Sequence, residues 1–542
     1  MSASNFFRVR SGFALVWLLL VGAVPLGRLL AEVVWSASPL DDPAIFHAAL
    51  RSLALAGGVT AIATGLGVAL AALLLLRRLP GRRPLLFGAI LPLLVPPQVM
   101  ALAVAQAAGP ASPLLLAVGL APPMGAANPA YGPGAMMLVL GVQSAPLVLL
   151  AIAALVRRLP DEAIMAARSL GCTPGGAFRR IAWPLLLPGV VAGAGLTWVA
   201  ALGNFGVAAS LGIPGRWPVL TVLLWQRLGA GGPQALAQAA GLAVVLAGLA
   251  LPGLLAQIFA TRARPLHHGR VFTPLPIRGG AAVAGGIAAY LALVLGLPLL
   301  SLAATALVPA LGVAPNLDTL TARHFLTALA PGAQTARAIT VSFGLSAGAA
   351  VVLALASLPV ALALRARPVR IAAAIADLPQ ALPGAVTAVA AILVVLPWGG
   401  ALYGSIWLIG LAYLTRFHAL ALRPVAAVAA RLDPRLDFAA RGMAAGLWWR
   451  ARAVWLPPLT PALVAGGLVV TLLAVNEVTV SSLLIGPGAV TLGTLVFNLQ
   501  DAGLAPLAAA TSLLALGLVA ALMAAATLAG RGLPAGTLPW RP

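Results

Sequence analysis

MAARSLGCTPGGAFRRIAWPLLLP, residues 165–188, is the stretch that decides how this 542-residue chain is organised. Arginine, glycine and proline interrupt a background there that is otherwise apolar. A second stretch of the same kind, FAARGMAAGLWWRARAVWLPPLTP, occupies residues 438–461, so that a shift of 273, from Met165 to Phe438, carries the first stretch onto it. A segment that recurs at one fixed distance is typical of chains built from repeated units, so we expect the fold to have two related parts.

The composition is that of a membrane protein. Hydrophobic residues make up 61% of the chain and charged residues only 8%, whereas about 25% of the residues of a soluble globular protein are charged. The apolar runs are long enough to cross the bilayer as helices, and they lack the alternation of a β-barrel. The net charge of +22 would suggest nucleic acid in a soluble chain, but here we attribute it to membrane topology and expect no nucleic-acid partner.

We predict an all-α polytopic membrane fold with about twelve transmembrane helices in the lipid bilayer. The first run is too long for a signal peptide, so we expect it to remain as a membrane helix. Prolines make the third and ninth spans the least regular. The predicted limits are 11–34, 50–76, 84–108, 134–157, 186–212, 234–260, 280–310, 336–364, 370–396, 402–430, 460–486 and 505–530.

Arginine accounts for every basic residue, because the chain has no lysine. Of the 33 arginines, 27 fall in segments that lie on one side of the membrane if both termini do. The positive-inside rule makes that side cytoplasmic, which predicts an even number of spans with both termini inside. The arginines outside this pattern are Arg28, Arg51, Arg216, Arg227, Arg323 and Arg337.

Arginine and proline positions match between the two parts of the chain. At the shift of 273 the matches are Arg168 with Arg441, Arg179 with Arg452, Pro184 with Pro457 and Pro188 with Pro461. Pro92 and Pro96 match Pro379 and Pro383 at a shift of 287, which places a longer outer loop, 109–133, in the first part. We therefore predict two tandem six-helix halves of the same orientation, 1–265 and 280–542, joined by a cytoplasmic connector, 266–279.

The two repeated stretches carry a recognisable pattern. Each lies on the predicted inner side and reads as two alanines, then a small residue, then an apolar residue three positions before proline. The pattern resembles the cytoplasmic loop of ABC importer permeases, E-A-A, three residues, G, nine residues, I-x-L-P. The residues that carry the resemblance are Ala166, Ala167, Arg168, Gly171, Arg179, Ile181 and Pro184 in the first loop, and Ala439, Ala440, Arg441, Ala444, Arg452, Val454 and Pro457 in the second.

The two loops also depart from that pattern. Met165 and Phe438 replace the glutamate, Trp183 replaces the leucine, and Ala444 replaces the glycine of the second loop. From the residues themselves we expect a short helix, a turn and a second helix, with exposed arginines that can pair with an acidic partner. Ordinary loops whose arginines only fix the topology are the alternative.

The resemblance covers nearly the whole chain and implies a function. It is closest to the fused, two-half permeases of the iron(III)-type branch, through segments such as LPLLVPPQVMALA at 91–103 and GNFGVAASLGIPG at 203–215. It implies the type I permease fold with pseudo-twofold halves in a bacterial inner membrane. It also implies iron(III) as cargo, an extracytoplasmic substrate-binding protein, and an ATPase dimer docked on the two loops. Thiamine, phosphonates and polyamines are the cargo of relatives and remain alternatives.

The chain itself cannot supply a P-loop, because that motif needs a lysine to reach the phosphates and there is none. We therefore expect this chain to bind no cofactor of its own, with ATP and Mg²⁺ held by the partner ATPase. We also expect no enzymatic activity, because paired carboxylates and histidine clusters are lacking at the membrane face. An ion-coupled secondary transporter is the competing class, and it would leave the two loops unexplained.

One acidic residue, Glu477, falls within a predicted span. A carboxylate in the membrane is costly and usually lines a pathway or meets a partner on a neighbouring helix. Asn476 precedes it, and Asn204 takes its place at the shift of 273. We predict that these three residues flank the outer end of the translocation pathway. No metal-ligand spacing is present, so His267, His268 and Cys172 are interpreted as incidental.

Overall fold

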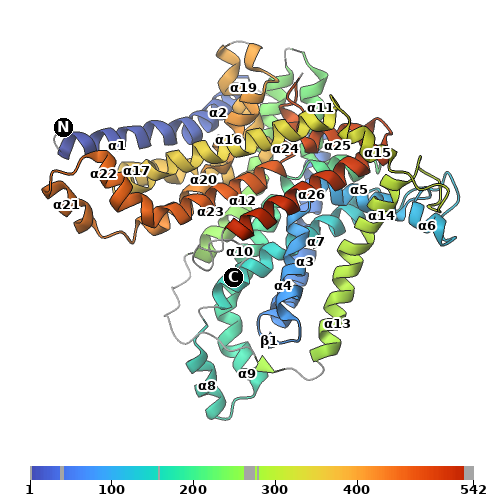
Figure 1. Cartoon of the computed structure of the whole chain (residues 1–542), viewed down its shortest axis with the longest axis horizontal. Helices are drawn as coiled ribbons and strands as arrows, with labels where there is room; N and C mark the ends of the chain where they lie inside the picture. Colours follow the sequence, from blue (N-terminus) through green and yellow to red (C-terminus); the bar gives the residue numbers. More distant parts are fainter. Residues whose placement is uncertain are drawn as a thin grey trace.

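The computed structural model describes residues 3–36, 42–156, 159–232, 234–261, 275–276, 280–398, 400–486 and 488–529. The regular secondary structure of this part is helical, apart from two two-residue strands. Ten helices in it are long and apolar enough to cross a membrane. The chain is therefore an all-α polytopic membrane protein, with its helices grouped into two arms that extend in different directions (Figure 1).

The elements before residue 277 begin with three helices and end with the second strand. They are α1 (Ala3–Leu18), η1 (Leu19–Ala23), α2 (Val24–Ser36), α3 (Pro43–Leu74), β1 (Arg77–Arg78), α4 (Arg82–Leu94), α5 (Pro97–Ala108), α6 (Pro113–Ala117), α7 (Pro133–Val156), α8 (Asp161–Ser169), α9 (Pro174–Ala177), η2 (Phe178–Ala182), α10 (Trp183–Leu202), η3 (Ala208–Gly212), α11 (Leu220–Ala230), α12 (Ala235–Thr261) and β2 (Leu275–Pro276).

The elements after residue 279 follow a similar order. They are α13 (Gly280–Leu291), η4 (Ala292–Gly296), α14 (Leu297–Leu307), α15 (Arg323–Leu329), α16 (Gln334–Ala363), α17 (Arg367–Ala376), α18 (Leu378–Ala381), α19 (Gly384–Val395), η5 (Leu396–Trp398), η6 (Gly400–Leu402), α20 (Ile406–Ala429), α21 (Pro434–Gly442), α22 (Leu447–Arg450), η7 (Ala451–Trp455), α23 (Leu456–Val475), α24 (Thr479–Leu483), α25 (Leu492–Asp501) and α26 (Ala505–Ala529).

Two of the predicted spans are broken where the sequence has its paired prolines. The third divides between α4 and α5 at Val95, and the ninth divides between α18 and α19, where the two arms of a bent pair differ in direction by 117°. Proline cannot donate the helical hydrogen bond and keeps the preceding residue out of the helix, which explains both breaks. Counting the bent pair as one span gives eleven candidates, and α20, which carries Arg416 and Arg423, covers the remaining predicted span.

The fifth and eleventh predicted spans are too long at their outer ends. We predicted helices to residues 212 and 486, but α10 ends at Leu202 and α23 ends at Val475. Short helical segments, η3 and α24, follow after a turn in each case. An apolar run continues past both turns, and periodicity alone cannot distinguish one long helix from a broken one.

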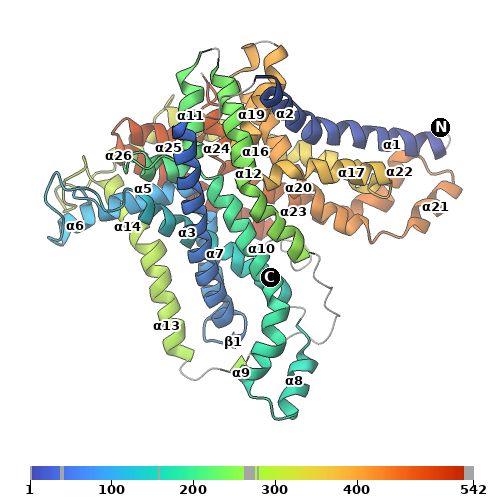
Figure 2. The same ribbon diagram turned by 180° about the vertical axis from the view of Figure 1, so that it is seen from behind.

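The first helices of each part pack against the other part of the chain. Helices α1 and α2 lie along α16, α17 and α19, while α13 and α14 lie along α4 and α5. Within the two arms, α3, α7 and α10 form one mutually packed group and α16, α20 and α23 form another. Figure 2 shows α1 beside α17 on one arm and α13 descending beside the other arm.

The core lies where the two arms meet. Phe205 and Phe497 contact each other there with ring centroids 5.6 Å apart, and both rings contact Trp225. Phe205 has no exposed surface. Most of the predicted connector, 266–279, lies outside the described residues, but Leu275–Pro276 pairs in parallel with Arg77–Arg78. The predicted connector and the predicted inner loop that follows α3 therefore contact each other.

Candidate functional sites: the repeated loops and the central contacts

The first repeated loop forms a helix, a tight turn and a second helix. Ala166, Ala167 and Arg168 lie on α8, and Gly171 forms the turn with φ +84°. Its N–H donates to the Arg168 carbonyl at 3.1 Å, and the N–H of Cys172 donates to the Ala167 carbonyl at 3.0 Å. These two bonds are those of a Schellman cap, which places a left-handed residue just past the helix end.

The chain then re-enters the apolar region without a break in helical structure. Arg179 and Ile181 lie on the π-helix η2, and Pro184 is in the first turn of α10. Pro184 lacks the N–H for a helical hydrogen bond, and it lies directly after the π-helical turn η2, where the regular bonding of the helix is already interrupted. The corresponding residues of the second loop, Arg452, Val454 and Pro457, take the same places on η7 and α23.

The turn of the second loop has the same two hydrogen bonds as the turn of the first loop. Ala439, Ala440 and Arg441 lie on α21, and Ala444 occupies the turn with φ +54°. Its N–H donates to the Arg441 carbonyl, and the N–H of Ala445 donates to the Ala440 carbonyl, both at 3.0 Å. An alanine in this conformation is strained by about 1–2 kcal/mol because of its Cβ atom. The backbone therefore keeps the turn where the sequence lacks the glycine.

The helices within each of the two loops are held together by different chemistry. Asp437 accepts hydrogen bonds from Arg441 at 2.6 Å and from Nε of Arg450 at 2.9 Å. The Arg450 guanidinium also stacks over the ring of Trp455, 5.0 Å from its centroid. The corresponding positions of the first loop, Ile164 and Ala177, are buried in an apolar cluster. An ion pair in one loop thus replaces an apolar contact in the other.

Large apolar side chains are exposed on both loops at matching positions. Leu170 and Met443, which precede the two turn residues, expose 88% and 70% of their surface. Met165 and Phe438, which stand where the loop pattern has glutamate, expose 59% and 80%. Exposed apolar side chains of this size that gather at one site mark contact surfaces for a partner. The loops lie at the ends of different arms, as α8 and α21 show in Figure 1.

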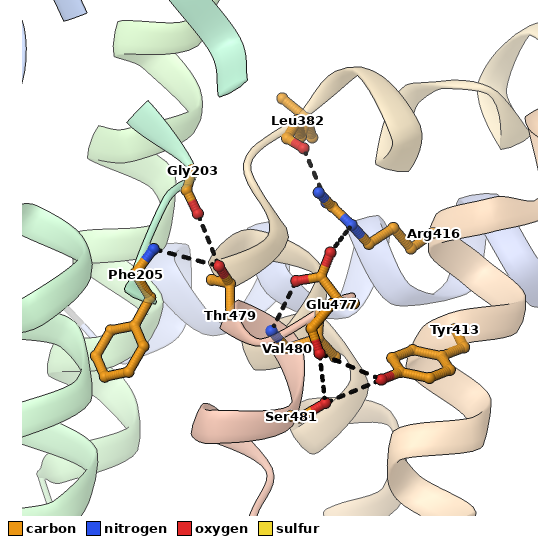
Figure 3. Close-up of polar contacts among 9 residues, drawn as sticks. All are labelled: Gly203, Phe205, Leu382, Tyr413, Arg416, Glu477, Thr479, Val480 and Ser481. Atoms are coloured by element: carbon orange, nitrogen blue, oxygen red, sulfur yellow. Dashed lines mark hydrogen bonds and ion pairs between the residues drawn. The ribbon is translucent and has the colours of Figure 1, made fainter. Parts of the chain in front are cut away.

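Glu477 lies at the centre of the molecule, in the turn between α23 and α24. Its Oε2 accepts a hydrogen bond from Nε of Arg416 at 3.1 Å, and its Oε1 accepts one from the N–H of Val480 at 3.1 Å. Nη1 of Arg416 donates to the carbonyl of Leu382 at 3.3 Å. Figure 3 shows these contacts joining α20, the α18–α19 break and the α23–α24 turn.

The prediction that Glu477 sits within a helix and that Arg416 lies at the inner face needs correction. Arg416 lies inside α20, and the two side chains, Arg416 and Glu477, are 18% and 11% exposed. Burial of either charge alone would be costly, so each charge compensates the other. The structure shows the contact of Glu477 with a neighbouring helix, through Arg416, and its place beside the pathway stays a prediction. Asn476 caps α23, and its side-chain oxygen is buried without a partner among the described residues.

The first part of the chain repeats two of these contacts with neutral side chains. Asn204 accepts a hydrogen bond from the N–H of Val207 at 2.9 Å through its side-chain oxygen, as Glu477 does from Val480. Gln143 stands in the place of Arg416 and donates to the carbonyl of Val95 at 3.1 Å. Gln143 is the residue that sequence reasoning missed, although the shift of 273 pairs it with Arg416.

Thr479 joins the two turns directly. Its hydroxyl donates to the carbonyl of Gly203 at 3.0 Å and accepts from the N–H of Phe205 at 3.3 Å (Figure 3). The turns that contain Asn204 and Glu477 therefore lie side by side in the core. Within the residues that the structure describes, His, Cys, Asp and Glu side chains form no group of three that could hold a metal ion, and His267 and His268 lie outside them.

Comparison with known proteins agrees with this architecture. A sequence model of the binding-protein-dependent transport system inner membrane component family matches residues 61–265, which include the first repeated loop. The molybdenum transport system permease protein ModB of Mycobacterium tuberculosis is 31% identical over 191 residues, which cover 34% of this chain and 69% of that protein. The chain belongs to this family of inner membrane transport components.

Other permeases match in a similar way. A probable molybdenum ABC transporter permease protein of Haloferax volcanii is 28% identical over 241 residues, covering 44% of this chain and 84% of that protein. The inner membrane ABC transporter permease protein YdcU of Escherichia coli is 37% identical over 70 residues, covering 13% of this chain and 22% of that protein. The chain is thus a multi-pass permease subunit of a binding-protein-dependent ABC importer, a family of transport permeases that work with ATPases and substrate-binding proteins.

Proposed function

We propose that this permease contains both halves of one translocation pathway and couples to a separate ATPase dimer through its two repeated loops. The observation that carries the proposal is the turn that Gly171 and Ala444 share, with matching hydrogen bonds in two loops related by the shift of 273. The reciprocal packing of α2 on α19 and of α14 on α5 supports a pseudo-twofold pair. Relatives matched over 69% and 84% of their length cover 34% and 44% of this chain, which supports a tandem duplication.

The loops suit a docking role because of what they expose. Arg168 and Arg441 lie in the last turns of α8 and α21, Arg168 exposed and Arg441 paired with Asp437, and the apolar side chains of Leu170 and Met443 are exposed at the turns. Arginine beside exposed apolar surface is the composition of a protein contact site. Met165 and Phe438 stand where the loop pattern has glutamate. In both loops, apolar contact with the ATPase would replace the contact that the glutamate makes. ATP and Mg²⁺ would be bound by the ATPase, and both termini would be cytoplasmic.

The pathway would pass the central turns. The turns that contain Asn204 and Glu477 meet between the two halves, and Asn476 lies beside them. Breaks in helices at a repeat interface are typical of transport pathways. Rocking of the two arms against each other would separate or join these turns, and the Thr479 contacts with Gly203 and Phe205 would form in one state and not in the other.

Molybdenum and iron(III) are the cargo candidates. Iron(III) follows from the resemblance of segments such as 203–215 to the iron(III)-type branch. The ModB protein and the archaeal relative are named for molybdenum, and none of the relatives reported above is named for iron. We therefore put molybdenum first, delivered by an extracytoplasmic binding protein. Thiamine, phosphonates and polyamines remain further candidates from the resemblance alone.

Uptake by reconstituted transporter tests the proposal. The chain is incorporated into liposomes with its cognate ATPase, and binding protein loaded with molybdate or iron(III) is supplied on the other side. We expect uptake that requires ATP, the ATPase and the loaded binding protein together, and that is lost in the double variant Arg168→Ala/Gly171→Leu. Uptake by the chain alone in response to a proton gradient would instead support a secondary transporter and contradict the proposal.

A further inference from the structure

A cavity of about 800 Å³ lies between the second repeated loop and the membrane helices of its arm. Ala361 near the end of α16 and Ala429 at the end of α20 line it, and so does Leu436 of α21. Figure 1 shows α17, α21 and α22 at the end of this arm. The predicted topology places these helix ends on the cytoplasmic side, so we expect the cavity to lie at the level of the inner lipid phosphates.

The cavity borders small side chains where the first half has large ones. Under the shift of 287, Ala361 takes the place of Leu74. Under the shift of 273, Ala429 takes the place of Val156. Leu74 and Val156 are buried in the apolar cluster that also contains Ile164 of the first loop. The larger side chains thus pack against their own loop in the first half, whereas the alanines of the second half border open space.

Arginine side chains from three segments line the same cavity. Arg365 follows α16, Arg370 belongs to α17 and Arg435 belongs to α21, and all three are exposed. Arg365 donates to the carbonyl of Leu432 at 3.0 Å. Arg370 and Arg435 have no ion-pair partner among the described residues. Like charges around one cavity repel each other, so a bound anion would stabilise them.

The carboxylates of the cavity already have hydrogen-bond donors within the protein. Asp433 caps α21, where its Oδ1 accepts a hydrogen bond from the N–H of Arg435 at 2.9 Å. Asp437 accepts hydrogen bonds from the guanidinium groups of Arg441 and Arg450. Four arginines and two aspartates are among the described lining residues, so positive charge is in excess and the cavity favours an anion.

The charge of this place also differs between the halves. Under the shift of 273, Arg435 stands where the first half has Glu162. Arg365 is not an addition of the second half, because Arg78 matches it under the shift of 287. One acidic residue is thus exchanged for a basic one in the half in which large apolar residues are exchanged for alanines. Open space and added positive charge therefore occur together in the second half.

We propose that this inner cavity binds an anionic phospholipid of the inner leaflet, with its phosphate on the arginines and the start of an acyl chain on the apolar wall. Arginine binds phosphate through two parallel N–H groups, and basic pockets between membrane helices on the cytoplasmic side bind anionic lipid head groups. Leu362, Leu364 and Trp455 are part of the apolar wall, which a soluble phosphate compound would leave uncovered. The bound lipid would hold α21 near the membrane helices, whether or not an ATPase is docked.

Native mass spectrometry of the delipidated full-length chain tests the site. The chain is titrated with phosphatidylglycerol, with phosphatidylcholine and with glycerol phosphate, and we expect one tight site for phosphatidylglycerol alone. Arg370→Gln/Arg435→Gln removes two charges and should weaken this binding roughly tenfold or more. Ala361→Leu/Ala429→Val introduces the residues of the first half. It fills the space at unchanged charge and should weaken binding by a similar factor.

Two matched double variants control for the loss of charge and for the added side chains. Arg367→Gln/Arg431→Gln removes two exposed arginines of the same inner segments, and Ala374→Leu/Ala427→Val enlarges two exposed positions of α17 and α20. None of these four residues is among the described residues that line the cavity. Both control variants are therefore expected to bind phosphatidylglycerol as the parent does.

Three results would overturn the site. They are equal binding of phosphatidylglycerol and phosphatidylcholine to the parent, binding of glycerol phosphate as tight as that of phosphatidylglycerol, and binding of phosphatidylglycerol by either cavity variant as strong as by its control. An acidic segment of the ATPase as the occupant would give the first of these results, together with loss of ATPase binding in Arg370→Gln/Arg435→Gln. Because lipid binding is measured on the permease alone, its failure would leave the proposed docking of the ATPase standing.

Discussion

Arg416 donates a hydrogen bond from Nε to Oε2 of Glu477 across 3.1 Å, in a part of the core where both side chains are largely buried. The same places in the first half hold Gln143 and Asn204, which are neutral. In both halves a side chain of the neighbouring helix binds the carbonyl at the break, Arg416 that of Leu382 and Gln143 that of Val95, and in the second half Arg416 also binds Glu477 of the central turn. We expect each of the two charges to need the other, because either one alone would be buried without a counter-charge.

Breaking this ion pair should destabilise the protein, and introducing the neutral residues of the first half should restore most of the stability. We expect Glu477→Gln to cost on the order of 3 kcal/mol, because Arg416 is then buried without its counter-charge. The double variant Arg416→Gln/Glu477→Asn reproduces Gln143 and Asn204 and should recover most of that loss. Thermal denaturation in detergent measures the effect. A double variant no more stable than the single variant would show that the two halves are not equivalent here.

The turn of the second loop should become more stable when its missing glycine is restored. Ala444→Gly removes the Cβ atom that strains a residue at φ +54°, and we expect a gain of about 1 kcal/mol. Gly171→Ala should cost about as much in the first loop. Hydrogen exchange at the amides of Ala445 and Cys172, which close the two caps, reports each change locally. Faster exchange at Ala445 in Ala444→Gly would contradict the account.

Asp437 should hold the two helices of the second loop, α21 and α22, together. Asp437→Asn leaves the buried Arg450 beside a neutral amide, and we expect a loss on the order of 3 kcal/mol or local unfolding of α21. The double variant Asp437→Ile/Arg450→Ala copies the apolar pair Ile164 and Ala177 of the first loop and should fold. Limited proteolysis between α21 and α23 measures the opening. Equal protease resistance in Asp437→Asn and the parent would mean that this ion pair does not hold the two helices together.

Close packing of α10 on α12 should depend on two glycines. A Cβ atom on Gly195 would lie 2.4 Å from the carbonyl oxygen of Gly253, so Gly195→Ala must push the helices apart. We expect a loss of about 1–3 kcal/mol, as for other overpacked sites. Gly248→Ala on α12 is the control, since no atom of the described residues lies within 4 Å of its Cβ position. The apparent melting temperature should fall for Gly195→Ala alone.

Much of this fold could be predicted from the sequence because membrane helices can be recognised by their length and hydrophobicity. The predicted limits of the spans at 134–157, 234–260 and 336–364 agree with α7, α12 and α16 within a few residues. Helix ends inside an apolar run were wrong, as at Leu202 and Val475. Nothing polar marks those ends, and the turns there are set by contacts between the two halves, such as that of Thr479 with Gly203.

The loops could be located from the sequence, but the ion pairs could not. The shift of 273 pairs Gly171 with Ala444, and in the structure each residue occupies the same position in the turn of its own loop. Asp437 is one position away from the motif's acidic place, so the pattern gave it no role. The positive-inside rule assigns Arg416 to the inner side because it considers only the positions of positive charges and not their ion-pair partners, here Glu477.

Cross-linking from the two loops to the ATPase tests the central claim most directly. In a Cys172→Ser background, Leu170→Cys and Met443→Cys place a thiol at matching exposed positions, and Leu317→Cys, 93% exposed, places one on the predicted outer side. A thiol-to-amine cross-linker is then used with the assembled transporter. The chain has no lysine, so its side chains cannot compete for the amine-reactive end. We predict one ATPase joined to each single loop variant, two joined to the double variant and none to Leu317→Cys. Capture through Leu317→Cys, or through neither loop, would contradict the account.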